Sequence, residues 1–84
     1  MAYESDYDEE EELALDLDML REDLVTELQA LSQYQEHIDT IEDEEAVRVL
    51  EQIRDDKKDH IAALLSLIQR LDPAQAEKFR KWGL

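Results

Sequence analysis

Cysteine is absent from this sequence of 84 residues, and glycine and proline occur only once each. Without cysteine the chain forms no disulfide and offers no thiolate to a metal. Because helix breakers are so rare and good helix formers so common, the composition favours helix throughout. No apolar run approaches the roughly 18 residues that span a bilayer. A chain this short rarely builds a sufficient core alone, so we expect an all-α protein that is stabilised by a metal or a partner subunit.

Basic residues are scarce as well. Nine Lys and Arg accompany 24 Asp and Glu, which gives a net charge of −15. No basic surface remains to neutralise phosphates, so nucleic acid is not an expected partner. The acidity has three interpretations that the charge does not separate: it keeps an oligomer soluble, it reflects a halophilic host, or it attracts cations. The acidic first residues differ from a secretory leader, so we expect a cytoplasmic protein with no membrane attachment.

The distribution of residue types divides the chain into an arm and a helical domain. Residues 1–12 contain seven acidic side chains and no Leu, Ile or Val, which predicts a disordered acidic arm. Residues 13–84 are expected to form the domain. In its first part, apolar residues recur at three- and four-residue steps up to Ile41, which predicts one long helix.

Two further helices are expected after a break in the apolar stripe. The second runs from about residue 44 to residue 71, with Asp43 as its N-cap. Asp72 followed by Pro73 predicts the start of a short third helix that ends near Trp82. The predicted fold is an antiparallel two-helix hairpin with a short helix at its C-terminal end.

The apolar stripes of both long helices follow a heptad pattern. The seam positions of the first helix are Leu20, Leu24, Glu27, Leu31, Tyr34, Ile38 and Ile41. Those of the second are Ala46, Leu50, Ile53, Lys57, His60, Leu64, Leu67 and Leu71. Glu27, Lys57 and His60 are therefore polar residues at seam positions, where a charge is costly unless it is paired or bound to a metal.

These three side chains lie at similar distances from the turn near residues 42 and 43, so an antiparallel hairpin brings them face to face. Tyr34 follows Glu27 by two turns on the same stripe, which brings a phenol near the cluster. The cluster is either a Glu27–Lys57 salt bridge, with His60 beside it, that fixes helix pairing, or a site of chemistry. Pairing with a second copy would place two such clusters opposite each other inside a four-helix bundle.

The region from about Leu24 to Phe79 resembles the encapsulated ferritins and, close behind them, short rubrerythrin-related ferritin-like proteins. In such bundles a Glu on one helix and a Glu-x-x-His on the next bind metal. The segments ELQALSQY, from Glu27 to Tyr34, and DDKKDH, ending at His60, carry the resemblance. It implies a di-iron site at a dimer interface, with Glu27 and His60 as metal ligands and Tyr34 as a catalytic residue. It also implies ferroxidase activity, iron storage, a decamer built from dimers, and enclosure in an encapsulin shell.

One position departs from the family pattern. The residue three before His60 is Lys57, whose ammonium cannot bridge two irons as a glutamate does. Asp56 is the neighbouring carboxylate that a rotated helix would bring in, although its reach is shorter. Our first hypothesis is an iron-handling ferritin-like protein with an altered or lost di-metal centre. The alternative is a metal-free structural oligomer held by the Glu27–Lys57 pair.

Overall fold

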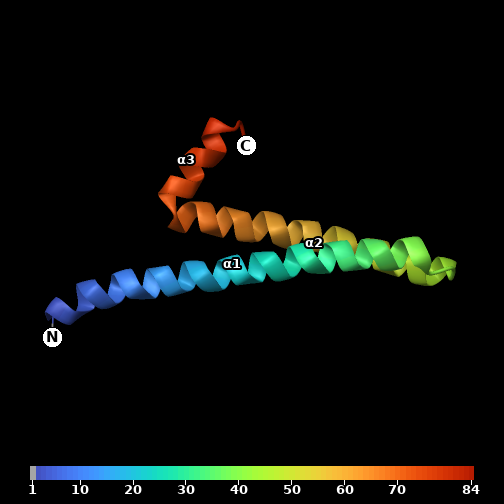
Figure 1. Ribbon diagram of the computed structural model, residues 1–84, viewed down its shortest axis with the longest axis horizontal. Coiled ribbons are helices and arrows are strands. Elements are labelled where there is room, and N and C mark those ends of the chain that lie inside the picture. Colours follow the sequence, from blue (N-terminus) through green and yellow to red (C-terminus); the bar gives the residue numbers. More distant parts are fainter. Residues whose placement is uncertain (1) are drawn as a thin grey trace.

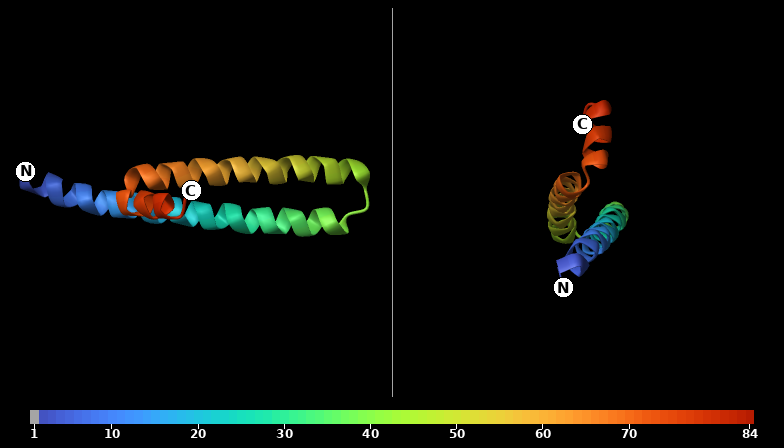
Figure 2. Two further views of the ribbon diagram at one scale, coloured as in Figure 1. Left: turned by 90° about the horizontal axis from the view of Figure 1, so that it is seen from above. Right: turned by 90° about the vertical axis from the view of Figure 1, so that its left-hand side faces the viewer.

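The structure, a computed structural model, describes the backbone of residues 2–84 and the side chains of residues 9–84. It consists of three helices, α1 (Ala2–Thr40), α2 (Glu44–Leu71) and α3 (Pro73–Lys81), and the described residues contain no strand (Figure 1). The two long helices run antiparallel and side by side (Figure 2). The predicted all-α hairpin with a short third helix is therefore confirmed.

Side-chain caps set the boundaries of α2. The Asp43 carboxylate accepts a hydrogen bond from the Ala46 backbone N–H at 2.8 Å, which satisfies one of the free donors of the first turn. Glu44 and Glu45 then place two negative charges at the positive end of the helix dipole. As a result, the chain reverses within the short link between α1 and α2.

Asp72 both starts α3 and ties it to the hairpin. Its Oδ1 accepts the Gln75 backbone N–H at 3.3 Å, and Pro73 occupies the first turn, where its missing N–H does no harm. Its Oδ2 accepts a hydrogen bond from Arg21 of α1 at 2.9 Å. Gly83 ends the segment with a φ of 74°, a conformation that glycine adopts without strain.

The N-terminal part of α1 differs from the expected arm. The backbone of residues 2–12 is helical, where the sequence predicts a disordered segment. Ala and Glu are good helix formers, and acidic side chains are favourable near the N-terminal end of a helix. Residue 1 and the side chains of residues 1–8 lie outside the described part, and the division into an arm and a domain from residue 13 stays a prediction. Beyond the contact of Arg21 with Asp72, this part of α1 extends past the end of α2 (Figure 2).

Little of the chain is buried, because the helices form a single layer. The shortest extent of the molecule is 14 Å, close to the diameter of one helix with its side chains, about 10–12 Å. Within the described residues, Ile68 is the one buried apolar residue, at 4% exposure. Several large apolar side chains stay exposed: Leu13, Leu15, Met19, Val25, Leu28, Ile41, Val49, Leu67, Trp82 and Leu84. None of the described helices is long and apolar enough to cross a membrane.

Ile68 should therefore be the most sensitive apolar position of the hairpin. We expect Ile68→Ala to lower the free energy of unfolding by about 2–5 kcal/mol, and Ile68→Val by about 0.5–1.5 kcal/mol, because larger truncations leave larger cavities. Urea unfolding at one fixed protein concentration measures both values. Equal effects of the two variants would contradict the burial of this side chain.

Candidate metal centre

Glu27 of α1 lies between Lys57 and His60 of α2. Lys57 Nζ is 3.1 Å from Glu27 Oε2, and His60 Nδ1 is 3.0 Å from Glu27 Oε1. Lys57 and His60 are three residues apart, so one face of α2 presents both groups to the same carboxylate. The heptad pattern predicted this convergence, and the structure confirms that the three side chains meet.

The cluster is buried on one side and open on the other. The side chains of Glu27 and Lys57 are 20% and 23% exposed, whereas that of His60 is 53% exposed. Glu27 Oε2 is a buried atom, and although Lys57 lies within hydrogen-bonding distance, the contact lacks the geometry of a hydrogen bond. The Glu27–Lys57 contact is thus best described as an ion pair.

This environment makes Glu27 a stronger acid. The Lys57 ammonium lowers the pKa of Glu27 below its ordinary value of 4.5, burial opposes that effect, and His60 adds a smaller lowering. The carboxylate is consequently ionised at neutral pH and already shared between two partners.

The lowered pKa has a consequence for stability in acid. A carboxyl group whose pKa falls on folding contributes stability that is complete above its unfolded-state pKa and is lost as the pH falls through the folded-state pKa. We therefore expect wild type to exceed Glu27→Gln in stability near neutral pH, and the difference to shrink below about pH 4.5. Urea midpoints between acid and neutral pH measure it, with Glu36→Gln as the control for the loss of one charge. A difference that stays constant over this range would contradict the pairing.

The open side of the cluster is a shallow groove between α1 and α2. It has a volume of about 360 Å³ and is lined by Asp23, Thr26, Glu27, His60, Ala63 and Leu64. Asp23 precedes Glu27 by one turn, and no spacing in the sequence connects it with His60. The part of the His60 ring that does not contact Glu27 is exposed in this groove.

Two other predicted site residues do not join the cluster. Tyr34 is half-buried on the α1 stripe, and its hydroxyl makes no hydrogen bond to Glu27, Lys57 or His60 in the described structure. Asp56 is exposed and, among the described residues, makes no ion pair or hydrogen bond with Glu27 or His60. The predicted roles of Tyr34 in catalysis and of Asp56, Glu27 and His60 in metal binding stay predictions.

The described residues of one chain do not form a di-metal centre by themselves. Among the described residues, no three His, Asp or Glu side chains converge closely enough to hold a metal ion. Glu27 and His60 are the two groups of ligand type in the cluster, and Lys57 adds a positive charge instead of a carboxylate. From the described residues, a metal bound here would have two protein ligands, Glu27 and His60.

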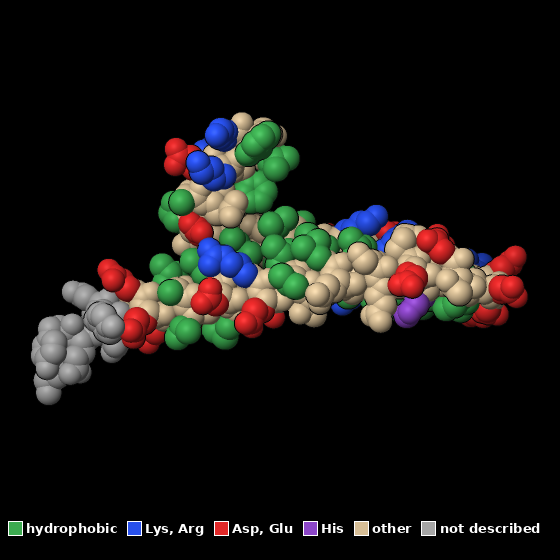
Figure 3. All heavy atoms as spheres, viewed as in Figure 1, with side chains coloured by type: hydrophobic (Ala, Val, Ile, Leu, Met, Phe, Trp, Pro, Cys, Tyr) green, Lys and Arg blue, Asp and Glu red, His purple; other side chains and the backbone are tan. Residues whose placement is uncertain are grey.

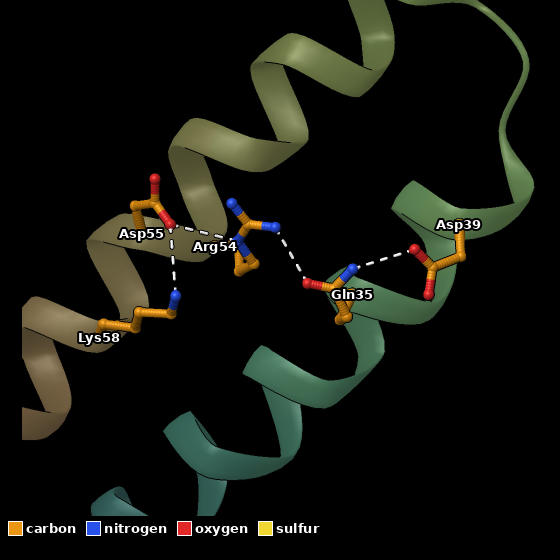
Figure 4. Close-up of polar contacts among 5 residues, drawn as sticks. All are labelled: Gln35, Asp39, Arg54, Asp55 and Lys58. Carbon is orange, nitrogen blue, oxygen red and sulfur yellow. Dashed lines mark hydrogen bonds and ion pairs between the residues drawn. The ribbon is translucent and has the colours of Figure 1, made fainter.

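A second polar network joins the helices nearer the turn (Figure 4). Arg54 of α2 donates to the Gln35 side chain of α1 at 2.9 Å, and Gln35 donates to Asp39 at 3.0 Å. Arg54 also pairs with Asp55, which contacts Lys58 at 3.7 Å. Sequence reasoning missed the link between Arg54 and Gln35, because only the i,i+4 and i,i+3 pairs within each helix leave a signal in the sequence. The network helps to fix the register in which Glu27 meets Lys57.

Comparison with known proteins gives two matches. The family model described as EncFtn-like matches residues 2–82. The encapsulin nanocompartment cargo protein EncC of Myxococcus xanthus (strain DK1622) is 39% identical over 57 residues, which cover 68% of this chain and 44% of that protein. The chain thus matches less than half the length of this relative. No solved structure matches the chain.

Proposed function

Because the chain belongs to the EncFtn-like family, we propose that it is an iron-handling, ferritin-like cargo protein of an encapsulin compartment with an altered di-metal centre. The matched relative is named as encapsulin cargo, which supports a location inside such a shell. Iron is the substrate in this proposal.

One observation carries the altered centre. Glu27, which the resemblance makes a metal ligand, is held by the Lys57 ammonium at 3.1 Å and by His60 at 3.0 Å. A cation at this place neutralises the carboxylate and repels Fe(II). We therefore propose that iron binds weakly at Glu27 and His60 and is oxidised slowly.

We also propose that the working unit is a homodimer or a multiple of one, such as the decamer that the resemblance implies. The exposed apolar side chains support this, since burying each is worth roughly 1.5–3 kcal/mol. At micromolar concentration, light scattering should give a mass that is an even multiple of the 9.9 kDa chain. A folded monomer at that concentration would rule out the proposed assembly.

The proposal is tested by following Fe(II) oxidation at neutral pH under air. Wild type should oxidise Fe(II) faster than the double variant Glu27→Gln/His60→Ala, which lacks both groups of ligand type. Circular dichroism and light scattering establish that the double variant keeps its helices and mass. Tight, stoichiometric iron binding and fast oxidation by wild type would instead show that Lys57 does not weaken the site, with Asp56 as the first carboxylate to test.

The alternative is a metal-free structural oligomer, and the same pair of side chains favours it. An ammonium that already neutralises Glu27 lets the seam close without any metal. In that case wild type and the double variant oxidise Fe(II) at the same rate as buffer, and added metal does not change the stability of wild type.

A further inference from the structure

The N-terminal part of α1 presents an acidic and apolar face that the hairpin does not cover. Residues 9–19, here called the overhang, contain six acidic side chains and no basic one. Leu15 and Asp16 lie three and four residues after Glu12, and Met19 lies four and three residues after them, so all four share one face of the helix. Leu15 and Met19 are 61% and 55% exposed. Two carboxylates therefore flank two uncovered apolar side chains.

The segment that begins with α3 has the opposite charge. Residues 73–84 contain three of the nine basic residues and a single acidic one, whereas residues 1–40 contain fourteen acidic residues and one basic one. Lys and Arg side chains stand out on α3, and acidic ones line α1 (Figure 3). Segment 73–84 is thus a positive region on a strongly negative protein.

This segment also carries an apolar hollow beside its charges. A depression of about 200 Å³ is lined by Gln75, Lys78, Phe79, Trp82 and Leu84. Trp82 and Leu84 are 76% and 80% exposed, and the Leu84 backbone N–H donates to the Phe79 carbonyl at 2.8 Å, which folds the end of the segment over the hollow. Lys78, Lys81 and Trp82 share one face by their spacing. Lys78 lies at the edge of the hollow.

The two surfaces cannot meet within one chain. In the described structure α3 packs against α2 and not against α1. It projects from α2 on the side away from α1, and seen along the hairpin α3 and the N-terminal part of α1 lie at opposite ends of the view (Figures 1 and 2). Within the described residues, therefore, neither surface is covered by the other.

We propose that α3 of one chain docks on the overhang of a second copy, with Leu15 seated in the hollow between Phe79, Trp82 and Leu84. Lys78 and Lys81 then face Glu12 and Asp16 of the second copy. The two surfaces carry opposite charges, and both surround exposed apolar side chains. This complementarity selects a second copy as the occupant. The contact either repeats reciprocally about a two-fold axis or joins copies head to tail, and both arrangements extend a dimer formed by the hairpin faces into a larger assembly.

Charge reversal and restoration test the contact through the mass of the assembly. Wild type at tens of micromolar should exceed the mass of a dimer in light scattering, and Lys78→Glu/Lys81→Glu should reduce it to a dimer. Adding Glu12→Lys and Asp16→Lys to that variant should restore the wild-type mass. The control Arg48→Glu/Arg70→Glu changes the net charge by the same amount at exposed positions of α2 and should leave the mass unchanged. An unchanged mass in Lys78→Glu/Lys81→Glu, or the same loss in the control, would overturn the proposal.

Cross-linking provides a second measurement that does not depend on charge. Since the chain has no cysteine, chains carrying Leu15→Cys and Trp82→Cys each contain one thiol. Co-expressed, with a size tag on one of them, they should form a disulfide-linked mixed pair under mild oxidation. Leu28→Cys, which is exposed within the paired part of the hairpin, replaces Leu15→Cys as the control and should cross-link at least tenfold less. Equal cross-linking of the two pairs would overturn the proposal. Neither experiment uses iron, so their failure is separate from a failure of the iron-handling proposal.

Discussion

Replacing Lys57 with glutamate is expected to turn a weak metal binder into a protein whose stability depends on bound metal. The change removes the cation next to Glu27 and adds the carboxylate that a Glu-x-x-His arrangement supplies. Without metal, two carboxylates crowd the same place and repel each other, so the variant should be less stable than wild type. With Zn²⁺ or Fe(II), binding to the folded state should stabilise it, by about 2.7 kcal/mol when the free metal is at 100 times its Kd. Fe(II) oxidation should rise at least tenfold.

The measurements are the melting temperature with and without metal, and the rate of Fe(II) oxidation under air. Lys58→Glu is the matched control, because it makes the same change of charge one residue away, on a side chain that is 61% exposed and contacts Asp55 rather than Glu27. It should gain neither metal dependence nor activity. If Lys57→Glu also gains neither, Glu27, His60 and position 57 do not form a metal site in the assembled protein, and the metal-free oligomer becomes the better description.

The hairpin could be predicted from the sequence because its signals are local. Asp43 and Asp72 are caps whose side chains bond to backbone N–H groups three residues on, and those contacts depend on no distant part of the chain. The meeting of Glu27 with Lys57 and His60 was also accessible, since heptad spacing and one turn fix the register of two antiparallel helices. An error of one heptad in that register would have separated them.

What escaped prediction depends on side-chain reach or on a balance of weak terms. Arg54 spans from α2 to Gln35, and no spacing rule distinguishes this arginine from an exposed one. The groove beside Asp23 follows from how far His60 leans out of the seam, which a heptad position does not specify. The helical backbone of residues 2–12 depends on a competition between helix propensity and charge repulsion, a balance that residue spacing does not decide.

Lys57→Met is expected to destabilise the protein because it takes away the main partner of Glu27 and leaves Oε2 buried without any cation. The melting temperature at neutral pH should fall by several degrees, more than for Lys58→Met at the exposed neighbour. With the ammonium gone, the effect of burial, which raises the pKa of Glu27, is opposed by His60 alone, so the pKa should lie above its value in wild type. The stability that Glu27 adds between acid and neutral pH should therefore be smaller in the variant than in wild type.

A double-mutant cycle separates this explanation from a simple loss of packing by the lysine stem. Glu27→Gln removes the charge that Lys57→Met leaves unpaired, so the double variant should regain most of the lost stability and lose the altered pH dependence. If the stem alone matters, the effects of the two single changes add and the double variant is the least stable of the set. An additive result would show that the Glu27–Lys57 contact holds no more energy than an exposed ion pair, and the proposed neutralisation of the centre by Lys57 would then be wrong.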